Sequence, residues 1–186
     1  MVSVVVPFRA EGKTRLPEEI RADLARAMLA DVVAAALELG RVLVVGDDAN
    51  AVPVGAEAVA DPGSGQGGAV AAALALVDGH VLVVNADLPC ATSDALRRLA
   101  AAGPALVAAA DGTTNALSLP DPSCFEPLYG PGSAARFAAA GLVPVRIPEL
   151  ELDVDTLDDL EHLVRPLGDR TALVFQEHKV LIARAG

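Results

Sequence analysis

A run of four valines in five residues, from Val2 to Val6, limits how this chain can fold more than any other feature. The run shows no alternation of apolar and polar side chains, which is typical of a strand buried on both faces of a parallel sheet. Residues that follow such strands lie at the carboxyl edge of the sheet, where ligands bind in open α/β folds. We therefore expect the segment after Phe8 at a ligand-binding edge.

Two cations, Lys13 and Arg15, follow this strand and stand just ahead of a long helix that opens at Pro17. Cationic side chains and the backbone N–H groups at the start of a helix both favour a bound anion. A ligand phosphate is therefore expected here, with Lys13 and Arg15 as its contacts. Apolar residues at nearly every fourth position carry the helix to Leu39, and Gly40 follows it.

Apolar runs and helical patterns continue to alternate along the chain, which is typical of an α/β fold with a largely parallel sheet. Strands are expected over residues 41–45, 56–60, 80–87, 105–110 and 143–147. Helices are expected over residues 69–77, 93–99, 134–140 and 156–164. No linker, repeat or low-complexity segment interrupts the chain, so residues 1–186 are expected to form one domain.

Two apolar runs flank the polar residues Gln176 to Lys179 near the C-terminus. This pattern predicts a β-hairpin over residues 171–183, within an appendage that spans residues 166–186. Such a hairpin would either edge the sheet or pair with another subunit, and the second arrangement would give a homodimer.

The composition excludes several classes of protein. A formal charge of −11 and a pI near 4.6 leave no broad basic surface, so no nucleic-acid partner is expected. Cys90 and Cys124 lack the spacing of a zinc site or a disulfide framework, and both are expected in the core or a pocket wall. No apolar run approaches the ~18 residues of a spanning helix and no signal sequence opens the chain, which predicts a cytoplasmic protein without a membrane partner.

Residues 61–68 form a glycine-rich segment, with four glycines between Gly63 and Gly68. Glycine loses much conformational freedom on ordering, so this density needs a reason. One interpretation is a flexible surface connection. The other is a loop whose backbone closely approaches a ligand, followed by a helix that presents its first N–H groups to the same ligand.

Three aspartates are candidates for a metal site. Asp87 comes directly after an apolar strand, and residues nearer the next helix are better placed to cap that helix. Asp153 and Asp155 lie two residues apart on one face of an extended segment; Asp155 or Thr156 can cap the next helix, so at least one carboxylate is spare. Carboxylates beside phosphate-binding loops are typical of a divalent-metal site, and Mg²⁺ is the expected ion.

A second anion site is expected near Gly130 and Ser133, where glycines expose the backbone at the start of the helix over 134–140. The alternative is a Gly/Pro turn in which Ser133 only caps the helix. That alternative does not account for the hydroxyl and amide side chains gathered at residues 113–115, so we favour anion binding.

Six short motifs occur in a fixed order along residues 2–165. They are Val-Val-Pro-Phe-Arg with Gly-Lys-Thr-Arg-Leu, Arg-Ala-Met-Leu-Ala-Asp-Val-Val, Asn-Ala-Asp-Leu-Pro, Gly-Thr-Thr-Asn-Ala-Leu, Tyr-Gly-Pro-Gly-Ser and Leu-Asp-Val-Asp-Thr. Together they resemble the guanylyltransferases that activate 2-phospho-L-lactate or phosphoenolpyruvate in the synthesis of the deazaflavin coenzyme F420 of actinobacteria and methanogens.

This resemblance implies a three-layer α/β/α fold with a Rossmann-like, mixed but mostly parallel sheet, similar to nucleotide-diphospho-sugar (GT-A-like) transferases. It implies an enzyme that joins GTP to the phosphate of a three-carbon acid and releases pyrophosphate. Its implied catalytic residues are Lys13, Arg15 and Asp87, and its implied nucleotide contacts are Pro7, Arg9, Lys13, Arg15, Asp61, Gly67 and Gly68. The implied magnesium ligands are Asp87 with Asp153 or Asp155, and the implied acid contacts are Thr114, Gly130 and Ser133.

Two departures from the family pattern leave alternatives open. Gly67-Gly68 stand where the family usually has Leu-Asn, and residues 171–183 extend past the usual end of the family. One alternative is a related nucleotidyltransferase of the molybdenum-cofactor or sugar-phosphate type, although those proteins usually have a glycine-rich first loop where this chain has Pro7-Phe-Arg. The other is a GTP-binding sensor without catalysis.

Overall fold

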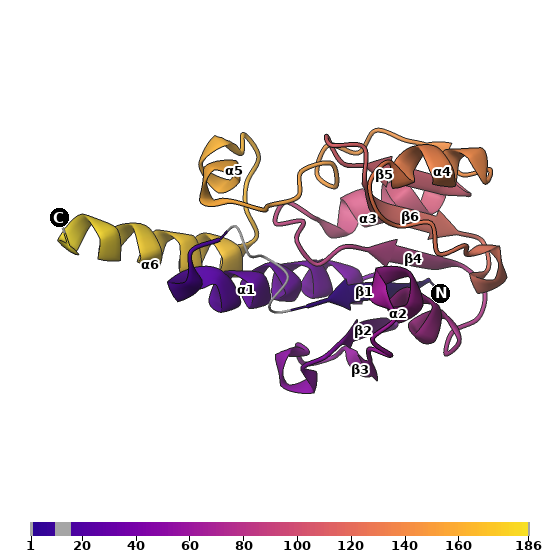
Figure 1. Cartoon of the computed structure of the whole chain (residues 1–186), viewed down its shortest axis with the longest axis horizontal. Coiled ribbons are helices and arrows are strands. Elements are labelled where there is room, and N and C mark those ends of the chain that lie inside the picture. Colours follow the sequence, from indigo (N-terminus) through magenta and orange to yellow (C-terminus); the bar gives the residue numbers. More distant parts are fainter. Residues whose placement is uncertain (1, 10–15, 186) are drawn as a thin grey trace.

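A mixed sheet of seven strands organises the residues that the computed structural model describes, 2–9 and 16–185. The spatial order of the strands is β3-β2-β1-β4-β6-β5-β7 (Figure 1). Strand β1 (Ser3–Phe8) pairs in parallel with β2 (Val42–Gly46) on one side and β4 (Val81–Val84) on the other. The valine run is therefore buried inside a parallel part of the sheet, as its sequence predicted.

The remaining strands extend the sheet on both sides of this centre. Strand β3 (Glu57–Ala60) pairs in parallel with β2 at one edge, and β7 (Val143–Pro144) pairs in parallel with β5 (Ala105–Ala108) at the other. Strand β6 (Thr114–Leu119) runs antiparallel to both β4 and β5. The sequence did not predict β6, because its polar residues resemble a loop although every residue of the strand is buried.

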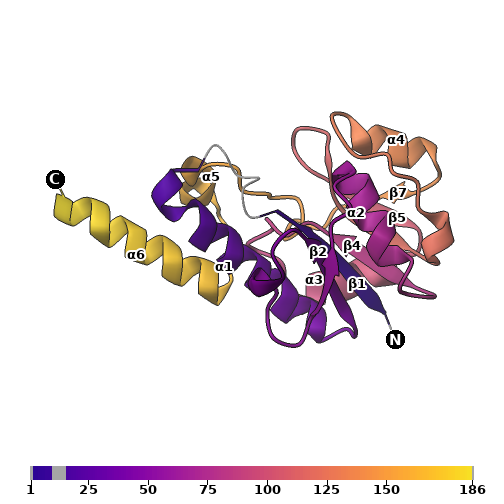
Figure 2. The ribbon, with the colours of Figure 1, turned by 60° about the horizontal axis from the view of Figure 1, so that its bottom comes forward.

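Helices cover both faces of the sheet and complete the three layers (Figure 2). Val4 and Val6 point toward the face covered by α1 (Glu18–Leu37) and α3 (Ser93–Ala101). Val5 points toward the face covered by α2 (Gly65–Leu74) and α4 (Ser133–Ala139). Successive side chains of a strand alternate between faces, so one apolar strand supplies both cores. The predicted α/β fold with a mixed, mostly parallel sheet is confirmed.

Short elements connect these layers and cap the helices. Thr92 caps α3 by accepting a hydrogen bond from the backbone N–H of Ala95 at 3.1 Å, as expected. Thr156 caps α5 (Leu157–His162) in a capping box with Asp159. Single 3₁₀ turns cover Ala49–Ala51 and Pro122–Cys124.

The predicted hairpin over residues 171–183 is wrong, because these residues belong to the long helix α6 (Asp169–Ala185). The polar residues 176–179 include no glycine, proline or asparagine that would favour a turn. Thr171 and Phe175, four residues apart, are instead buried on one face of a helix. Figure 1 shows α6 lying along α1 and extending away from the sheet, so the argument for a homodimer that began from a hairpin loses its basis.

The two cysteines differ in their surroundings. Cys90 is buried, and burial raises the pKa of its thiol to about 11. Cys124 is exposed, so the expectation of a core or pocket-wall position holds for Cys90 alone. The described residues contain no helix with the length and apolar character needed to cross a membrane.

Candidate active site

The topology of the sheet brings the candidate residues to one edge. The chain passes from β1 to β2 on one side and later to β4 on the other, so the strand order reverses at β1. Ligands of open α/β sheets bind at the carboxyl edge of such a reversal. Arg9, Asp61 and Asp87 follow β1, β3 and β4 at this edge, and the antiparallel β6 begins there with Thr114 and Asn115.

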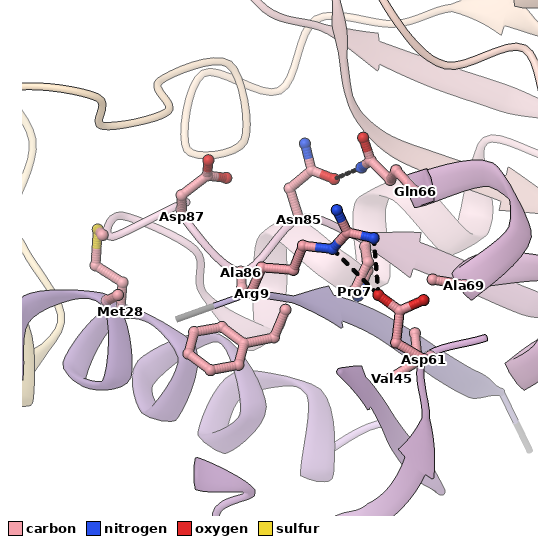
Figure 3. Close-up of a pocket in the computed structure, with 12 residues that line it drawn as sticks. Pro7, Arg9, Met28, Val45, Asp61, Gln66, Ala69, Asn85, Ala86 and Asp87 are labelled. Carbon is pink, nitrogen blue, oxygen red and sulfur yellow. Dashed lines mark hydrogen bonds and ion pairs between the residues drawn. The ribbon is translucent and has the colours of Figure 1, made fainter. Parts of the chain in front are cut away.

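A pocket of about 330 Å³ lies at this edge (Figure 3). Its walls include Pro7 within β1, Arg9 after β1, Asp61 after β3, and Asp87 after β4. The structure therefore brings together four residues that were predicted to bind the nucleotide or the metal. Apolar residues of α1 and α2 close the remaining sides, so the pocket has apolar walls and a few polar groups, as ligand sites usually do.

Arg9 and Asp61 form an ion pair in the wall of this pocket. Nε and Nη2 of Arg9 donate to the same oxygen, Oδ2 of Asp61, at 3.1 and 2.9 Å. The other oxygen, Oδ1, accepts from the backbone N–H of Gly63 at 2.8 Å. The Gly63 N–H, followed by the Arg9 guanidinium, holds the pKa of the Asp61 carboxyl below its usual range, so Asp61 is ionised at neutral pH.

An amide pair forms another polar part of the pocket. Gln66, in the first turn of α2, donates from Nε2 to Oδ1 of Asn85 at 2.9 Å. Asn85 in turn donates from Nδ2 to the backbone carbonyl of Thr114 at 3.2 Å. Sequence analysis missed both residues. The only signals were that Asn85 follows β4 and that Gln66 lies inside the glycine-rich segment.

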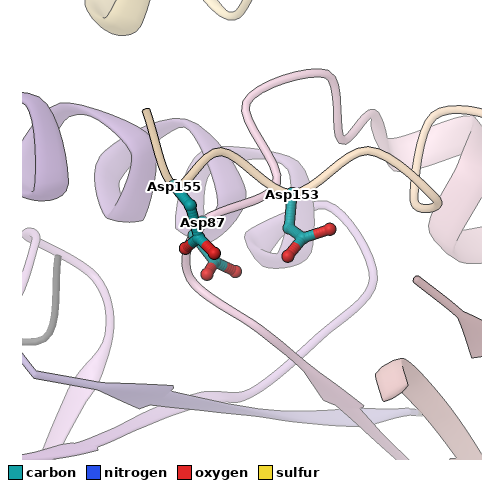
Figure 4. A group of neighbouring side chains, drawn as sticks. All are labelled: Asp87, Asp153 and Asp155. Carbon is teal, nitrogen blue, oxygen red and sulfur yellow. The ribbon is translucent and has the colours of Figure 1, made fainter. Parts of the chain in front are cut away.

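Asp87, Asp153 and Asp155 form an acidic cluster beside this pocket (Figure 4). One carboxylate oxygen from each residue lies within 4.8 Å of the other two. The backbone N–H of Val154 donates to the carbonyl of Asp87 at 3.1 Å and ties the two segments together. Because Thr156 and Asp159 form the cap of α5, neither Asp153 nor Asp155 supplies it. Carboxylate oxygens at this spacing are the ligands that a hard divalent cation prefers.

Asn115 supports this cluster from β6 and was not among the predicted site residues. Its side chain is 1% exposed, and its Nδ2 donates to the carbonyl of Leu150 at 3.1 Å and to Oδ1 of Asp153 at 3.4 Å. The two bonds fix the segment that carries the acidic residues against the sheet. The amide of Asn115 beside the hydroxyl groups of residues 113 and 114 was the signal in the sequence, and it was interpreted as part of an anion site.

The residues predicted to bind the acid also lie together. The hydroxyl groups of Thr114 and Ser133 are buried and 2.9 Å apart, and the backbone N–H of Ser133 donates to the carbonyl of Gly130 at 3.0 Å. Ser133 is the first residue of α4 rather than its cap, since Gly132 occupies the cap position with a φ of 71°. Of these three residues, Thr114 directly precedes Asn115 in β6, and Asn115 bonds to Asp153 of the acidic cluster.

Two further pairs of residues were predicted to contact the nucleotide: Gly67 with Gly68, and Lys13 with Arg15. Gly67 and Gly68 are part of α2, which begins four residues earlier than expected, and Gln66 takes the place in the pocket wall. A Cβ atom at Gly67 would lie 2.7 Å from Cβ of Pro127, so close packing explains this glycine. Lys13 and Arg15 lie outside the described residues.

The fold and this edge of the sheet define the class of protein. The structure resembles that of a protein from Desulfovibrio desulfuricans G20 assigned to the nucleotide-diphospho-sugar transferases, with a TM-score of 0.67 and 20% identity over 98% of this chain and 97% of the other. The chain therefore has the three-layer α/β fold of the nucleotide-diphospho-sugar (GT-A-like) transferases.

Sequence comparison gives the family. Residues 2–140 match the family described as guanylyl transferase CofC like, and the chain belongs to that family. It is 36% identical to phosphoenolpyruvate guanylyltransferase 2 of Rhodococcus jostii, over 88% of this chain and 84% of the relative. It is 35% identical to the phosphoenolpyruvate guanylyltransferase of Roseiflexus castenholzii, over 90% of each chain. The family resemblance inferred from the six motifs is confirmed.

Proposed function

We propose that this protein transfers GMP from GTP to phosphoenolpyruvate, forms enolpyruvyl-diphospho-guanosine and releases pyrophosphate, as a step in the synthesis of coenzyme F420. Membership of the guanylyl transferase family supports the donor, and the names of the relatives support phosphoenolpyruvate over 2-phospho-L-lactate as the acceptor. The observation that carries the proposal is the acidic cluster Asp87, Asp153 and Asp155 beside the pocket.

The reaction joins two anions, so catalysis depends on holding them in line and neutralising their charge. A phosphate oxygen of the acid attacks the α-phosphorus of GTP, and the bond from that phosphorus to the bridging oxygen of pyrophosphate breaks. No general base is needed, because the attacking oxygen is already ionised at neutral pH. The acidic cluster and the pocket lie at one edge of the sheet, and this placement agrees with a mechanism that holds the two anions together.

Three groups of residues have separate roles in this proposal. Asp87, with Asp153 or Asp155, would hold Mg²⁺, which when bound neutralises phosphate charge. Lys13 and Arg15 would contact the nucleotide phosphates. The residues on either side of them in the sequence support this role, because Arg9 lines the pocket and Leu16 packs in one cluster with Val154. Thr114, Gly130 and Ser133 would bind the acid on the β6 side of the acidic cluster.

A panel of substrates tests the proposed function. The protein is incubated with Mg²⁺, with GTP or ATP, and with phosphoenolpyruvate, 2-phospho-L-lactate, 3-phosphoglycerate or a sugar phosphate, while pyrophosphate release is followed. We expect release with GTP and phosphoenolpyruvate, and no release when the acid is omitted. Binding of GTP without release in any mixture would favour a sensor, and release only with a sugar phosphate would favour another nucleotidyltransferase.

Replacing Ser133 by alanine is expected to raise the KM for phosphoenolpyruvate by about tenfold while the KM for GTP stays within about twofold, because a hydrogen bond to a charged group is lost. Steady-state kinetics with each substrate varied in turn measure both constants. Ser123→Ala serves as the control, since the Ser123 hydroxyl bonds to Asp121 at 2.6 Å on the exposed surface. Equal changes in the two KM values would place the acid elsewhere.

A further inference from the structure

The ion pair of Arg9 and Asp61 has a geometry that a purely structural role does not require. Asp61 closes a local turn through its bond to the Gly63 N–H, and that single bond accounts for Oδ1. That bond does not explain why Arg9 also pairs with Asp61. Arg9 follows β1, is half-exposed, and donates two hydrogen bonds to Oδ2. The side chain of Asp61, in contrast, is only 6% exposed. The result is an ionised carboxylate with a fixed orientation in the pocket wall.

The hydrogen-bonding capacity of this pair is specific. An ionised carboxylate only accepts hydrogen bonds, and each of its oxygens accepts more than one. A guanidinium only donates, and since Nε and Nη2 of Arg9 hold Asp61, its Nη1 can donate to a further acceptor. The wall therefore presents carboxylate acceptors and a guanidinium donor on two side chains that are bonded to each other.

Guanine matches this arrangement and adenine does not. The Watson–Crick edge of guanine has two donors, N1–H and the 2-amino group, beside one acceptor, O6. Adenine has an acceptor at N1, which a carboxylate would repel, and no amino group at position 2. A buried group that is left without its partner makes such discrimination large.

We propose that Asp61, oriented by Arg9, selects guanine over adenine by accepting hydrogen bonds from N1–H and the 2-amino group, with Arg9 donating to O6. The proposal rests on the proposed function in one respect, that the pocket takes the nucleotide. It adds the residue that determines which base the pocket accepts. The lowered pKa of Asp61 supports it, because the carboxylate keeps its charge at neutral pH.

Xanthosine triphosphate tests the role of Asp61 directly, because xanthine has a carbonyl where guanine has the 2-amino group. We expect Asp61→Asn to weaken GTP binding by about tenfold to hundredfold and to strengthen binding of xanthosine triphosphate by about tenfold, since the asparagine amide donates to that carbonyl. Equilibrium dialysis of each nucleotide, without an acid substrate, measures both affinities. A gain of affinity cannot result from a loss of folding.

The wild-type protein supplies a second measurement that needs no variant. Inosine triphosphate, which lacks the 2-amino group, should bind about tenfold more weakly than GTP, and xanthosine triphosphate more weakly still. Glu57→Gln is the matched control, because Glu57 lies on β3, the strand that Asp61 follows, and pairs with Arg41 outside the pocket. This control should leave all three affinities unchanged.

Several outcomes would overturn the proposal. Equal weakening of the binding of GTP and xanthosine triphosphate in Asp61→Asn would mean that Asp61 contacts the ribose or only positions Arg9. Equal affinity of the wild-type protein for the three purine nucleotides would remove the selection altogether. The expected exchange of base preference, found in a protein that releases no pyrophosphate with any acid, would support the role of Asp61 while contradicting the proposed transferase function.

Discussion

Replacing Asp87 by asparagine is expected to lower kcat at least about 10³-fold, because a carboxylate that holds a divalent cation supports several kcal/mol of charge stabilisation in the transition state. Asparagine has nearly the same shape but no charge, so binding of the cation is lost while packing is kept. Pyrophosphate release with GTP and phosphoenolpyruvate measures the change. We expect the melting temperature to change by less than about 2 °C.

A measurement without turnover separates the role of Asp87 in metal binding from other roles. Saturating Mg²⁺ should raise the melting temperature of the wild-type protein, because a ligand that binds only the folded state stabilises it. This shift should disappear in Asp87→Asn. Asp158→Asn is the matched control, because Asp158 is an exposed carboxylate on α5, near the acidic cluster in sequence. A large loss of stability in Asp87→Asn without metal would instead make Asp87 a structural residue.

The sequence predicted the parts of the fold that depend on continuous apolar patterns. Strands β1, β2 and β4 are apolar runs rich in valine, and their apolar residues form much of the core. Strand β6 was missed because its polar residues form hydrogen bonds that no local pattern reveals: the Thr114 hydroxyl pairs with Ser133 and the Ser118 hydroxyl with His80. A polar residue in a strand resembles a loop until its distant partner is known.

The residues of the site likewise divide into those that a local sequence pattern indicates and those that depend on a distant partner. The convergence of Asp87, Asp153 and Asp155 could be predicted, because Asp87 follows β4 and the other two come after β7, and both strands end at the same edge of the sheet. The pair formed by Gln66 and Asn85 could not, because it joins two residues from different elements by one hydrogen bond. Helix α6 was misread as a hairpin since its contacts with α1 are distant in sequence, and the bond of Thr171 to Asp31 spans 140 residues.

That contact leads to the prediction with the largest effect on stability. Asp31 is 8% exposed, and its Oδ2 accepts from the backbone N–H and the hydroxyl of Thr171 at 2.9 and 2.7 Å. Its Oδ1 accepts from the backbone N–H of Arg170 at 3.2 Å. The carboxylate thus caps the start of α6 from a different helix, and it fixes α6 against α1.

Replacing Asp31 by alanine is therefore expected to lower the free energy of unfolding by about 3 to 5 kcal/mol, because two buried donors of Thr171 lose their acceptor. This is a large part of the 5–15 kcal/mol that is typical of a folded domain. Urea denaturation should show a lower midpoint, and hydrogen exchange should become faster in the first turn of α6. Asp169→Ala, at an exposed residue of the same turn, is expected to change stability by less than about 1 kcal/mol.

Gly168 supplies an independent check on the contact between Asp31 and α6. A Cβ atom at position 168 would collide with the Asp31 carboxylate, so Gly168→Ala should also destabilise the protein. In the double variant, the clash with the carboxylate is removed while Cβ of residue 31 remains, at 2.6 Å from the new methyl group, so the combined loss should be smaller than the sum of the two separate losses. Strictly additive losses would show that the two residues do not share one contact, and that α6 is held against α1 by its apolar residues alone.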